Sequence, residues 1–203
     1  NSLFFYDPDY RILFIGHAYG SGEIINQGDS SFQRYVEHYS DNHDLYVFGG
    51  DFIKNCKSDI ELKNFKTSIS SIYDKSIFIY GNHEYYCYDS EKMNFLKSFE
   101  NTSITYNDNI FFFINSNFTS RKDLDLAISK VSEGVDYSRV FIFSHQVFFE
   151  KSDFLLRTNS REYYELGYEF YDRINKLNFN DLYIISGDIG TAKYLHHLVF
   201  HLT

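Results

Sequence analysis

The stretch Ile77-Phe-Ile-Tyr-Gly-Asn-His83 joins a short apolar run to a glycine and two polar side chains. A nearly continuous apolar run of this length is typical of a strand that is covered on both faces of its sheet. The same layout, an apolar run that ends in Gly or Ser and then a polar residue, recurs at 11–17, 45–51, 140–145 and 182–188. A sixth apolar run, 110–114, is read as lacking a comparable polar ending. The repetition predicts several buried strands with polar side chains at their ends.

Amphipathic patterns lie between these runs. Ser58-x-x-Glu61 predicts the start of a helix, and Ser120 precedes a second apolar stripe. The two stripes have helical spacing and comprise residues 62, 65, 69 and 72, and residues 124, 127, 128 and 131. Further stripes lie at 32–39, 93–99 and 161–177. Alternating strands and helices predict an α/β layered fold, and helical apolar stripes normally face the core.

Composition limits the domain organisation and the partners. The 203 residues contain one proline and no low-complexity tract, so we expect a single domain over 1–203. Because the chain ends inside an apolar stretch, we also expect a C-terminal continuation. The net charge of -9 argues against general nucleic-acid binding. No apolar run approaches the roughly 20 residues needed for a membrane span. Cys56 and Cys87 form no disulfide framework, which favours reduced thiols and a cytoplasmic protein. The oligomeric state is left open.

Polar residues at strand ends are the candidates for a ligand site. In open α/β sheets, ligands bind beyond the carboxyl ends of the strands. Asp51, Asn82, His145 and Asp188 all fall at such ends. Carboxylate, amide and imidazole ligands suit Mn²⁺, Fe²⁺, Zn²⁺ or Mg²⁺. We therefore expect these four residues to gather around a divalent metal, the alternative for each being an ordinary turn or capping role.

Three of these motifs stand in a recognisable order. Gly50-Asp51, Gly81-Asn82-His83-Glu84 and Ser144-His145, each after an apolar run, resemble the motifs of the calcineurin-like metallophosphoesterase family. The resemblance covers about residues 11 to 190. It implies a four-layer α/β/β/α sandwich and hydrolysis of a phosphoester with one or two divalent metal ions. It also implies that His83 acts as the general acid or contacts the phosphate.

The first and last motifs depart from the family pattern. His17-Ala-Tyr19 stands where the family has Asp-x-His, and Asp188-Ile-Gly190 stands where it has Gly-His-x-His. The resemblance implies that one metal site keeps four ligands, with Asp188 replacing a histidine. The other site would keep only His17 beside the shared Asp51. His17 is therefore expected either as a metal ligand or as a contact to the phosphoryl group.

The leading prediction is a metal-dependent hydrolase of a small soluble phosphomonoester or phosphodiester. One strongly bound metal can act as a Lewis acid and activate a water for attack on phosphorus. Mn²⁺ is the favoured ion, and His83, Asp51 and His17 are the expected catalytic residues. The alternative is a catalytically degenerate domain that binds metal or phosphate and serves as an interaction module. A metal-dependent hydrolase of some other bond is a third, weaker possibility.

Overall fold

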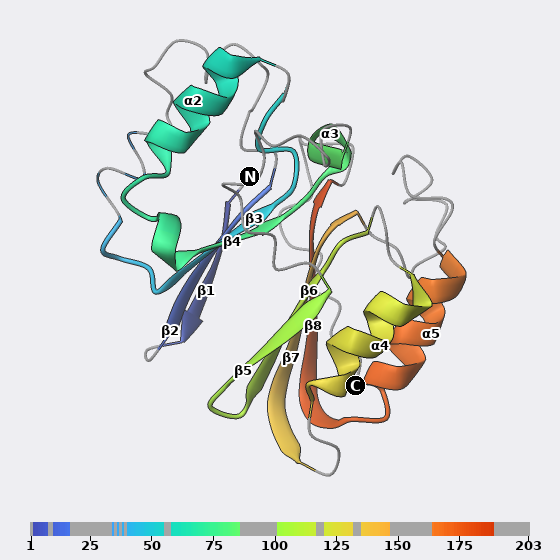
Figure 1. The fold of residues 1–203 in the computed structure, drawn as a ribbon. Coiled ribbons are helices and arrows are strands. Elements are labelled where there is room, and N and C mark those ends of the chain that lie inside the picture. Colours follow the sequence, from blue (N-terminus) through green and yellow to red (C-terminus); the bar gives the residue numbers. More distant parts are fainter. Residues whose placement is uncertain are drawn as a thin grey trace. The chain divides into compact units, whose positions relative to one another are not determined.

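The computed structural model describes residues 2–7, 10–16, 34, 36, 38, 40–54, 58–85, 101–116, 120–131, 135–146 and 164–188. The chain divides into two compact units (Figure 1), which we call unit 1 (Asn1–Ser98) and unit 2 (Phe99–Thr203). Each unit contains one sheet and is described by itself. The prediction of a single domain over 1–203 stays a prediction.

Unit 1 contains a four-stranded sheet with the order β1-β2-β3-β4. The strand β1 is antiparallel to β2, whereas β2, β3 and β4 run parallel to one another. Its strands are β1 (Ser2–Asp7), β2 (Tyr10–Ile15), β3 (Leu45–Gly49) and β4 (Ser76–Ile79). Its helices are α2 (Asp59–Ser68), a 3₁₀ turn η2 (Tyr73–Lys75) and α3 (Asn82–Tyr85).

The core of unit 1 lies between its sheet and α2. The hydroxyl of Ser58 accepts the backbone N–H of Glu61 at 3.4 Å, so α2 begins where its sequence predicts. Residues 62, 65, 69 and 72 of the predicted stripe are all buried, the last two beyond the end of the helix. Phe65 stacks on Phe52 with ring centroids 5.0 Å apart. In a protein without tryptophan, such ring contacts make up much of the core.

Unit 2 repeats the strand plan of unit 1. Its sheet has the order β5-β6-β7-β8, in which β5 is antiparallel to β6 and the other strands are parallel. Asn107, with a φ of 52°, lies in the two-residue loop of the β5–β6 hairpin, and asparagine tolerates this left-handed conformation. The strands are β5 (Thr102–Tyr106), β6 (Asn109–Ile114), β7 (Asp136–Gln146) and β8 (Asn178–Asp188), and the helices are α4 (Arg121–Ser129) and α5 (Tyr164–Ile174).

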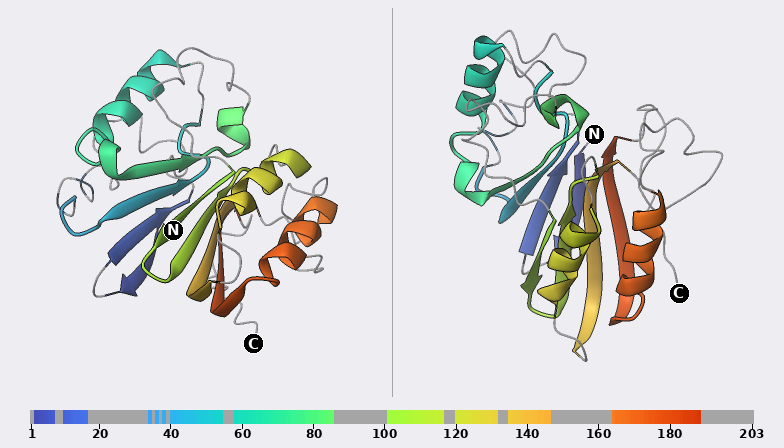
Figure 2. Two further views of the ribbon diagram at one scale, coloured as in Figure 1. Left: turned by 60° about the horizontal axis from the view of Figure 1, so that its bottom comes forward. Right: turned by 45° about the vertical axis from the view of Figure 1, so that its right-hand side comes forward.

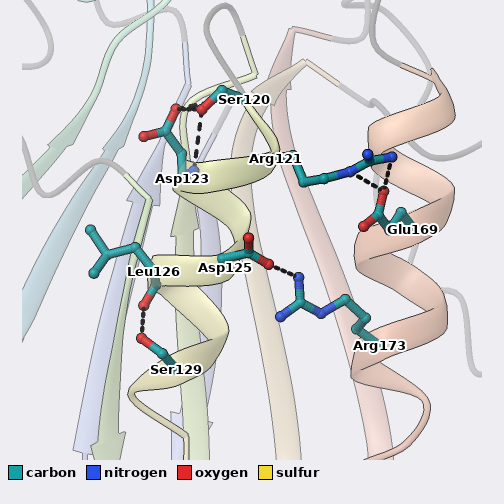
Figure 3. Close-up of polar contacts among 8 residues, drawn as sticks. All are labelled: Ser120, Arg121, Asp123, Asp125, Leu126, Ser129, Glu169 and Arg173. Carbon is teal, nitrogen blue, oxygen red and sulfur yellow. Dashed lines mark hydrogen bonds and ion pairs between the residues drawn. The ribbon is translucent and has the colours of Figure 1, made fainter.

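The two helices of unit 2 lie side by side against one face of its sheet (Figures 1 and 2). Ser120 and Asp123 form the predicted capping box at the start of α4. Figure 3 shows two ion pairs between the helices, in which Arg121 of α4 binds Glu169 and Arg173 of α5 binds Asp125. Apolar side chains of both helices pack on alternate residues of β6, β7 and β8. The predicted stripe at 161–177 thus contains α5.

Each sheet also carries apolar rings on the face opposite its helices. In unit 2, Phe111, Phe141 and Tyr183 stack across three neighbouring strands, with centroids 4.9 Å apart at each step. In unit 1, the ring of Phe14 covers Gly49 so closely that an added Cβ would lie 2.1 Å from its Cζ. Strands of this kind read as continuous apolar runs because both of their faces are apolar.

The structure confirms the α/β class and adds two strands that the sequence reading omitted, β1 and β5. The four-layer stacking stays a prediction. Of the stripe at 32–39, Arg34, Val36 and His38 are helical, and Val36 is buried. The stripe at 93–99 lies outside the described residues. No helix among the described residues is long and apolar enough to cross a membrane.

Candidate metal centre

The four predicted metal ligands divide equally between the two units. Asp51 and Asn82 belong to unit 1, and His145 and Asp188 belong to unit 2. In unit 1, the two residues lie just beyond the ends of the parallel strands β3 and β4. In unit 2, they lie in the last two residues of the parallel strands β7 and β8. Parallel pairing brings the carboxyl ends of neighbouring strands to one edge of a sheet. Each unit therefore carries one half of the predicted ligand set at one sheet edge.

In unit 1, the chain leaves β3 through a turn with two consecutive positive φ angles. Gly50 has a φ of 85° and Asp51 a φ of 52°. Glycine adopts such angles without steric cost, but a residue with a Cβ does so at an energetic cost of order 1 kcal/mol or more. Asp51 is also 2% exposed. A buried carboxylate held in an uncommon backbone conformation marks this turn as a site candidate.

The carboxylate of Glu84 accepts hydrogen bonds from both loops of this half-site. Its Oε2 accepts the backbone N–H groups of Asp51 at 2.8 Å and Gly81 at 2.9 Å, and its Oε1 accepts that of Ile53 at 2.9 Å. Glu84 has no exposed surface. Burial and the nearby Asp51 carboxylate raise the pKa of Glu84 to about 7, and the three N–H donors oppose that rise.

Gly81 allows the two loops to approach each other closely. A Cβ at this position would lie 2.2 Å from Oδ1 of Asp51 and 2.5 Å from its backbone nitrogen. The same Oδ1 accepts the backbone N–H of His83 at 3.2 Å. The Gly-Asp and Gly-Asn-His-Glu motifs are thus in direct contact, as a shared site requires.

His83 and Asn82 are the partly exposed members of this half-site. Nδ1 of His83 lies 2.9 Å from the carbonyl oxygen of Lys54. Because a carbonyl only accepts, Nδ1 carries the hydrogen in this contact. The imidazole is therefore oriented by the loop that also contains Asp51.

In unit 2, His145 is completely buried near the end of β7. The hydroxyl of Ser144 donates to the carbonyl of Gln146 at 2.9 Å and lies 3.1 Å from the hydroxyl of Ser186 on β8. Gln146 in turn donates its backbone N–H to the hydroxyl of Ser116 at 2.9 Å. These bonds fix the strand end that carries His145.

The remaining predicted site residues are not described. His17, Tyr19, Gly190 and the side chain of Asp188 lie outside the described part of the chain. In the register of the sheet, Asp188 pairs with Gln146, the residue after His145. The parallel pairing of β7 with β8 thus supports a common sheet edge for His145 and Asp188.

The sequence reading missed several residues of this region. It treated the run 110–114 as having no polar ending, which is wrong, because Asn115 and Ser116 follow it and both are completely buried. It also gave no role to Glu84. A usable signal was present for Asn115 and Ser116, which form a polar pair directly after an apolar run.

The chemistry of the unit 1 half-site suits a divalent cation. Asp51 and Glu84 place two carboxyl groups close together in a buried region, and the charge of Asp51 helps to raise the pKa of Glu84. A cation against Asp51 would offset that repulsion, and the Asn82 amide offers a further oxygen ligand. Among the described residues, no group of three or more His, Cys, Asp or Glu side chains is gathered for metal binding. The complete ligand set therefore stays a prediction.

The comparison with known families agrees with the motifs. The family model for calcineurin-like phosphoesterases matches residues 10–191, which includes both half-sites. A search of curated proteins gave no match. Because the match extends over most of the 203 residues, the chain belongs to the calcineurin-like phosphoesterase family.

Proposed function

We propose that this protein is a metal-dependent phosphoesterase that hydrolyses a small soluble phosphomonoester or phosphodiester. The proposal rests on the direct contact between the Asp51 turn and the Gly81–Glu84 turn. These two turns contain the carboxylate of Asp51, the amide of Asn82 and the imidazole of His83. Family membership supports metal-dependent phosphoester hydrolysis in general. The substrate class, the choice of Mn²⁺ and the cytoplasmic location are parts of the proposal.

Asp51, Asn82, His145 and Asp188 would hold the principal metal, and His17 would contribute beside Asp51. When bound, a divalent ion supplies a Lewis acid for the phosphoryl oxygens and lowers the pKa of a water. The protein contributes orientation, because hydrogen bonds fix the Asp51 turn on Glu84 and the end of β7 on Ser116. Such fixed surroundings typically determine ligand geometry and metal affinity.

His83 would transfer a proton to the leaving oxygen. The bond of its Nδ1 to the Lys54 carbonyl sets the ring plane and leaves proton exchange to Nε2. His83 is partly exposed, so a substrate can reach the imidazole. A positioned general acid of this type contributes roughly 10²- to 10⁴-fold to a rate.

The proposal requires that the two halves of the ligand set meet. It is supported by the apolar rings on the helix-free face of each sheet, such as Phe14 in unit 1 and Phe141 in unit 2. Faces of this kind gain free energy when they are covered, at roughly 25 cal/mol per Å² of apolar surface. We therefore include the four-layer sandwich in the proposal.

The test uses Asp51→Asn and not an alanine substitution. Asparagine tolerates a φ near 52° and keeps the size of the side chain, so the change removes mainly the charge. We expect the rate of hydrolysis of a chromogenic phosphoester with Mn²⁺ to fall more than about 100-fold. Substitution of residues that only hydrogen-bond to metal ligands typically costs up to about 100-fold. Asp74→Asn, an exposed change in the same unit, is the matched control. A fully metallated wild-type protein that hydrolyses no phosphoester would refute the proposal.

The alternative function is a metal- or phosphate-binding interaction module without turnover. It is favoured by the sequence changes at the second metal, where Tyr19 and Gly190 replace expected histidines. Elemental analysis together with an activity assay separates the two functions. One or two ions per chain with turnover support the enzyme; bound ions without turnover on any phosphoester support the module.

A further inference from the structure

We propose that Glu84 is a positioning residue, whose carboxylate holds Asp51 in the conformation that presents its side chain to the metal. The inference rests on the proposed function for the identity of the bound group. It rests on the geometry of unit 1 for everything else. Glu84 itself would not bind the metal, because it is fully buried and its two oxygens accept three backbone N–H groups.

The backbone of Asp51 needs support from its surroundings. A φ of 52° is uncommon for a residue with a Cβ and persists where the surroundings determine it. The N–H of Asp51 itself and that of Ile53, two residues later, both point at Glu84. These two bonds fix the turn on both sides of Phe52, and therefore set the direction in which the Asp51 side chain leaves the backbone.

Glu84 also links the Asp51 turn to the neighbouring loop. Oε2 of Glu84 accepts the N–H of Gly81 as well as that of Asp51. One oxygen therefore joins the loop after β3 to the loop after β4. Because Gly81 lies directly against Oδ1 of Asp51, a change in the spacing of these loops would move that carboxylate.

The hydrogen bonds to Glu84 require a carboxylate. Both oxygens of a carboxylate accept hydrogen bonds, and bonds from N–H groups to a charged acceptor are stronger than neutral ones. A glutamine has the same shape, but its NH₂ group donates and would face either Ile53 N–H or the N–H groups of Asp51 and Gly81. Glu84→Gln should therefore break the hydrogen bonds to one of the two carboxylate oxygens without creating a cavity.

The first measurement needs no metal. Amide hydrogen exchange and NMR shifts of the metal-free full chain, at a pH well above the Glu84 pKa of about 7, report the N–H groups of Asp51, Ile53 and Gly81. In the wild type, we expect all three to be protected and shifted as in bonds to a carboxylate. In Glu84→Gln, we expect at least one of them to lose about tenfold or more in protection. Exposed, freely exchanging amides in the wild type, or no change in the variant, would overturn the inference. If the variant fails to fold, the wild-type measurement still decides.

The second measurement is Mn²⁺ titration of the full chain by calorimetry, with electron paramagnetic resonance of the bound ion. Glu84→Gln should weaken Mn²⁺ binding about 10- to 100-fold, the range typical of residues that support a ligand. Glu169→Gln is the control for the chemical change, and Ile72→Val, in the same core, is the control for lost stability. Both should bind Mn²⁺ as the wild type does.

The outcomes separate the two proposals. Unchanged Mn²⁺ affinity and an unchanged spectrum in Glu84→Gln would overturn the positioning role, while the proposed function would stand. An equal loss in Ile72→Val would overturn it too, because the effect would then follow stability. A wild type that binds no Mn²⁺ would count against the proposed function, and the amide measurement would still decide whether Glu84 sets the conformation of Asp51.

Discussion

Each unit builds a sheet in which an antiparallel hairpin leads into parallel strands, and each carries two of the four predicted ligands at the ends of its last two strands. The units differ in how those ends are held. In unit 1, a buried carboxylate, Glu84, accepts three N–H groups around a left-handed turn. In unit 2, the hydroxyls of Ser116 and Ser144 bond to the extended strand that itself carries His145.

The difference has an energetic meaning. Bonds to a carboxylate are individually stronger than bonds to a hydroxyl, and in unit 1 they meet on a single side chain. His145 lies within the β7 ladder, where many backbone bonds share the task of fixing it. We therefore expect the geometry of unit 1 to depend on single residues, and that of unit 2 to tolerate the loss of one bond.

The largest expected effect concerns the imidazole of unit 1. His83→Gln should lower kcat by about 10²- to 10⁴-fold through the loss of general-acid catalysis, and should change Mn²⁺ affinity little. Steady-state kinetics with a chromogenic phosphoester and parallel Mn²⁺ titrations check this, and His38→Gln, an exposed change in the same unit, is the control. An unchanged kcat would remove His83 from the mechanism.

A glycine pair tests the close approach of the two unit 1 loops. Gly81→Ala and Gly49→Ala both introduce a methyl group where no space exists, so each should lower the free energy of unfolding by about 1–3 kcal/mol. The added Cβ meets Oδ1 of Asp51 in the first case and the ring of Phe14 in the second. Urea unfolding should therefore show similar losses, whereas Mn²⁺ affinity should fall only in Gly81→Ala. Equal Mn²⁺ affinities would show that the contact with Asp51 does not matter.

The corresponding change in unit 2 is Ser116→Ala. It leaves the buried N–H of Gln146 without its acceptor, which typically costs about 1–3 kcal/mol of unfolding free energy. Because β7 remains in its ladder, Mn²⁺ affinity should stay close to that of the wild type. Ser129→Ala, at the exposed end of α4 (Figure 3), is the matched control and should be nearly neutral. A large loss of Mn²⁺ affinity in Ser116→Ala would show that the metal ligands of unit 2 depend on single hydrogen bonds as much as those of unit 1 do.

The smallest effect is expected at the surface of unit 2. The Arg121–Glu169 pair between α4 and α5 is exposed to solvent. Arg121→Gln should therefore lower the free energy of unfolding by only about 0.2–1 kcal/mol, and salt should reduce the difference. Urea unfolding at low and high ionic strength measures both. A loss that persists in high salt would contradict an electrostatic origin.

The parallel strands of the fold were readable from the sequence, whereas β1 and β5, the antiparallel strands at the sheet edges, were not. The strand β6 is a continuous apolar run, because its side chains are buried on both faces. The strand β5, by contrast, is half polar and largely exposed at the edge of its sheet, so its sequence resembles that of a loop. The helix starts at Ser58 and Ser120 were predictable, since capping depends on local residues.

For the site, the motifs predicted the Asp51 and His83 turns, and the structure brings these turns into contact. The function of Glu84 was not predictable, because it depends on N–H groups 31 and 33 residues away in sequence. The positive φ of Asp51 was equally hidden, since aspartate is common in turns of every type.

The proposed function requires Asp51 and Asn82 of unit 1 to bind the same metal ion as His145 and Asp188 of unit 2. The most direct test is the Mn²⁺ content and affinity of three proteins: the wild type, Asp51→Asn from unit 1 and His145→Asn from unit 2. We expect the wild type to bind Mn²⁺ and each variant to lose most of this affinity. Wild-type affinity in His145→Asn, together with a loss in Asp51→Asn, would contradict a shared site and confine the metal to unit 1.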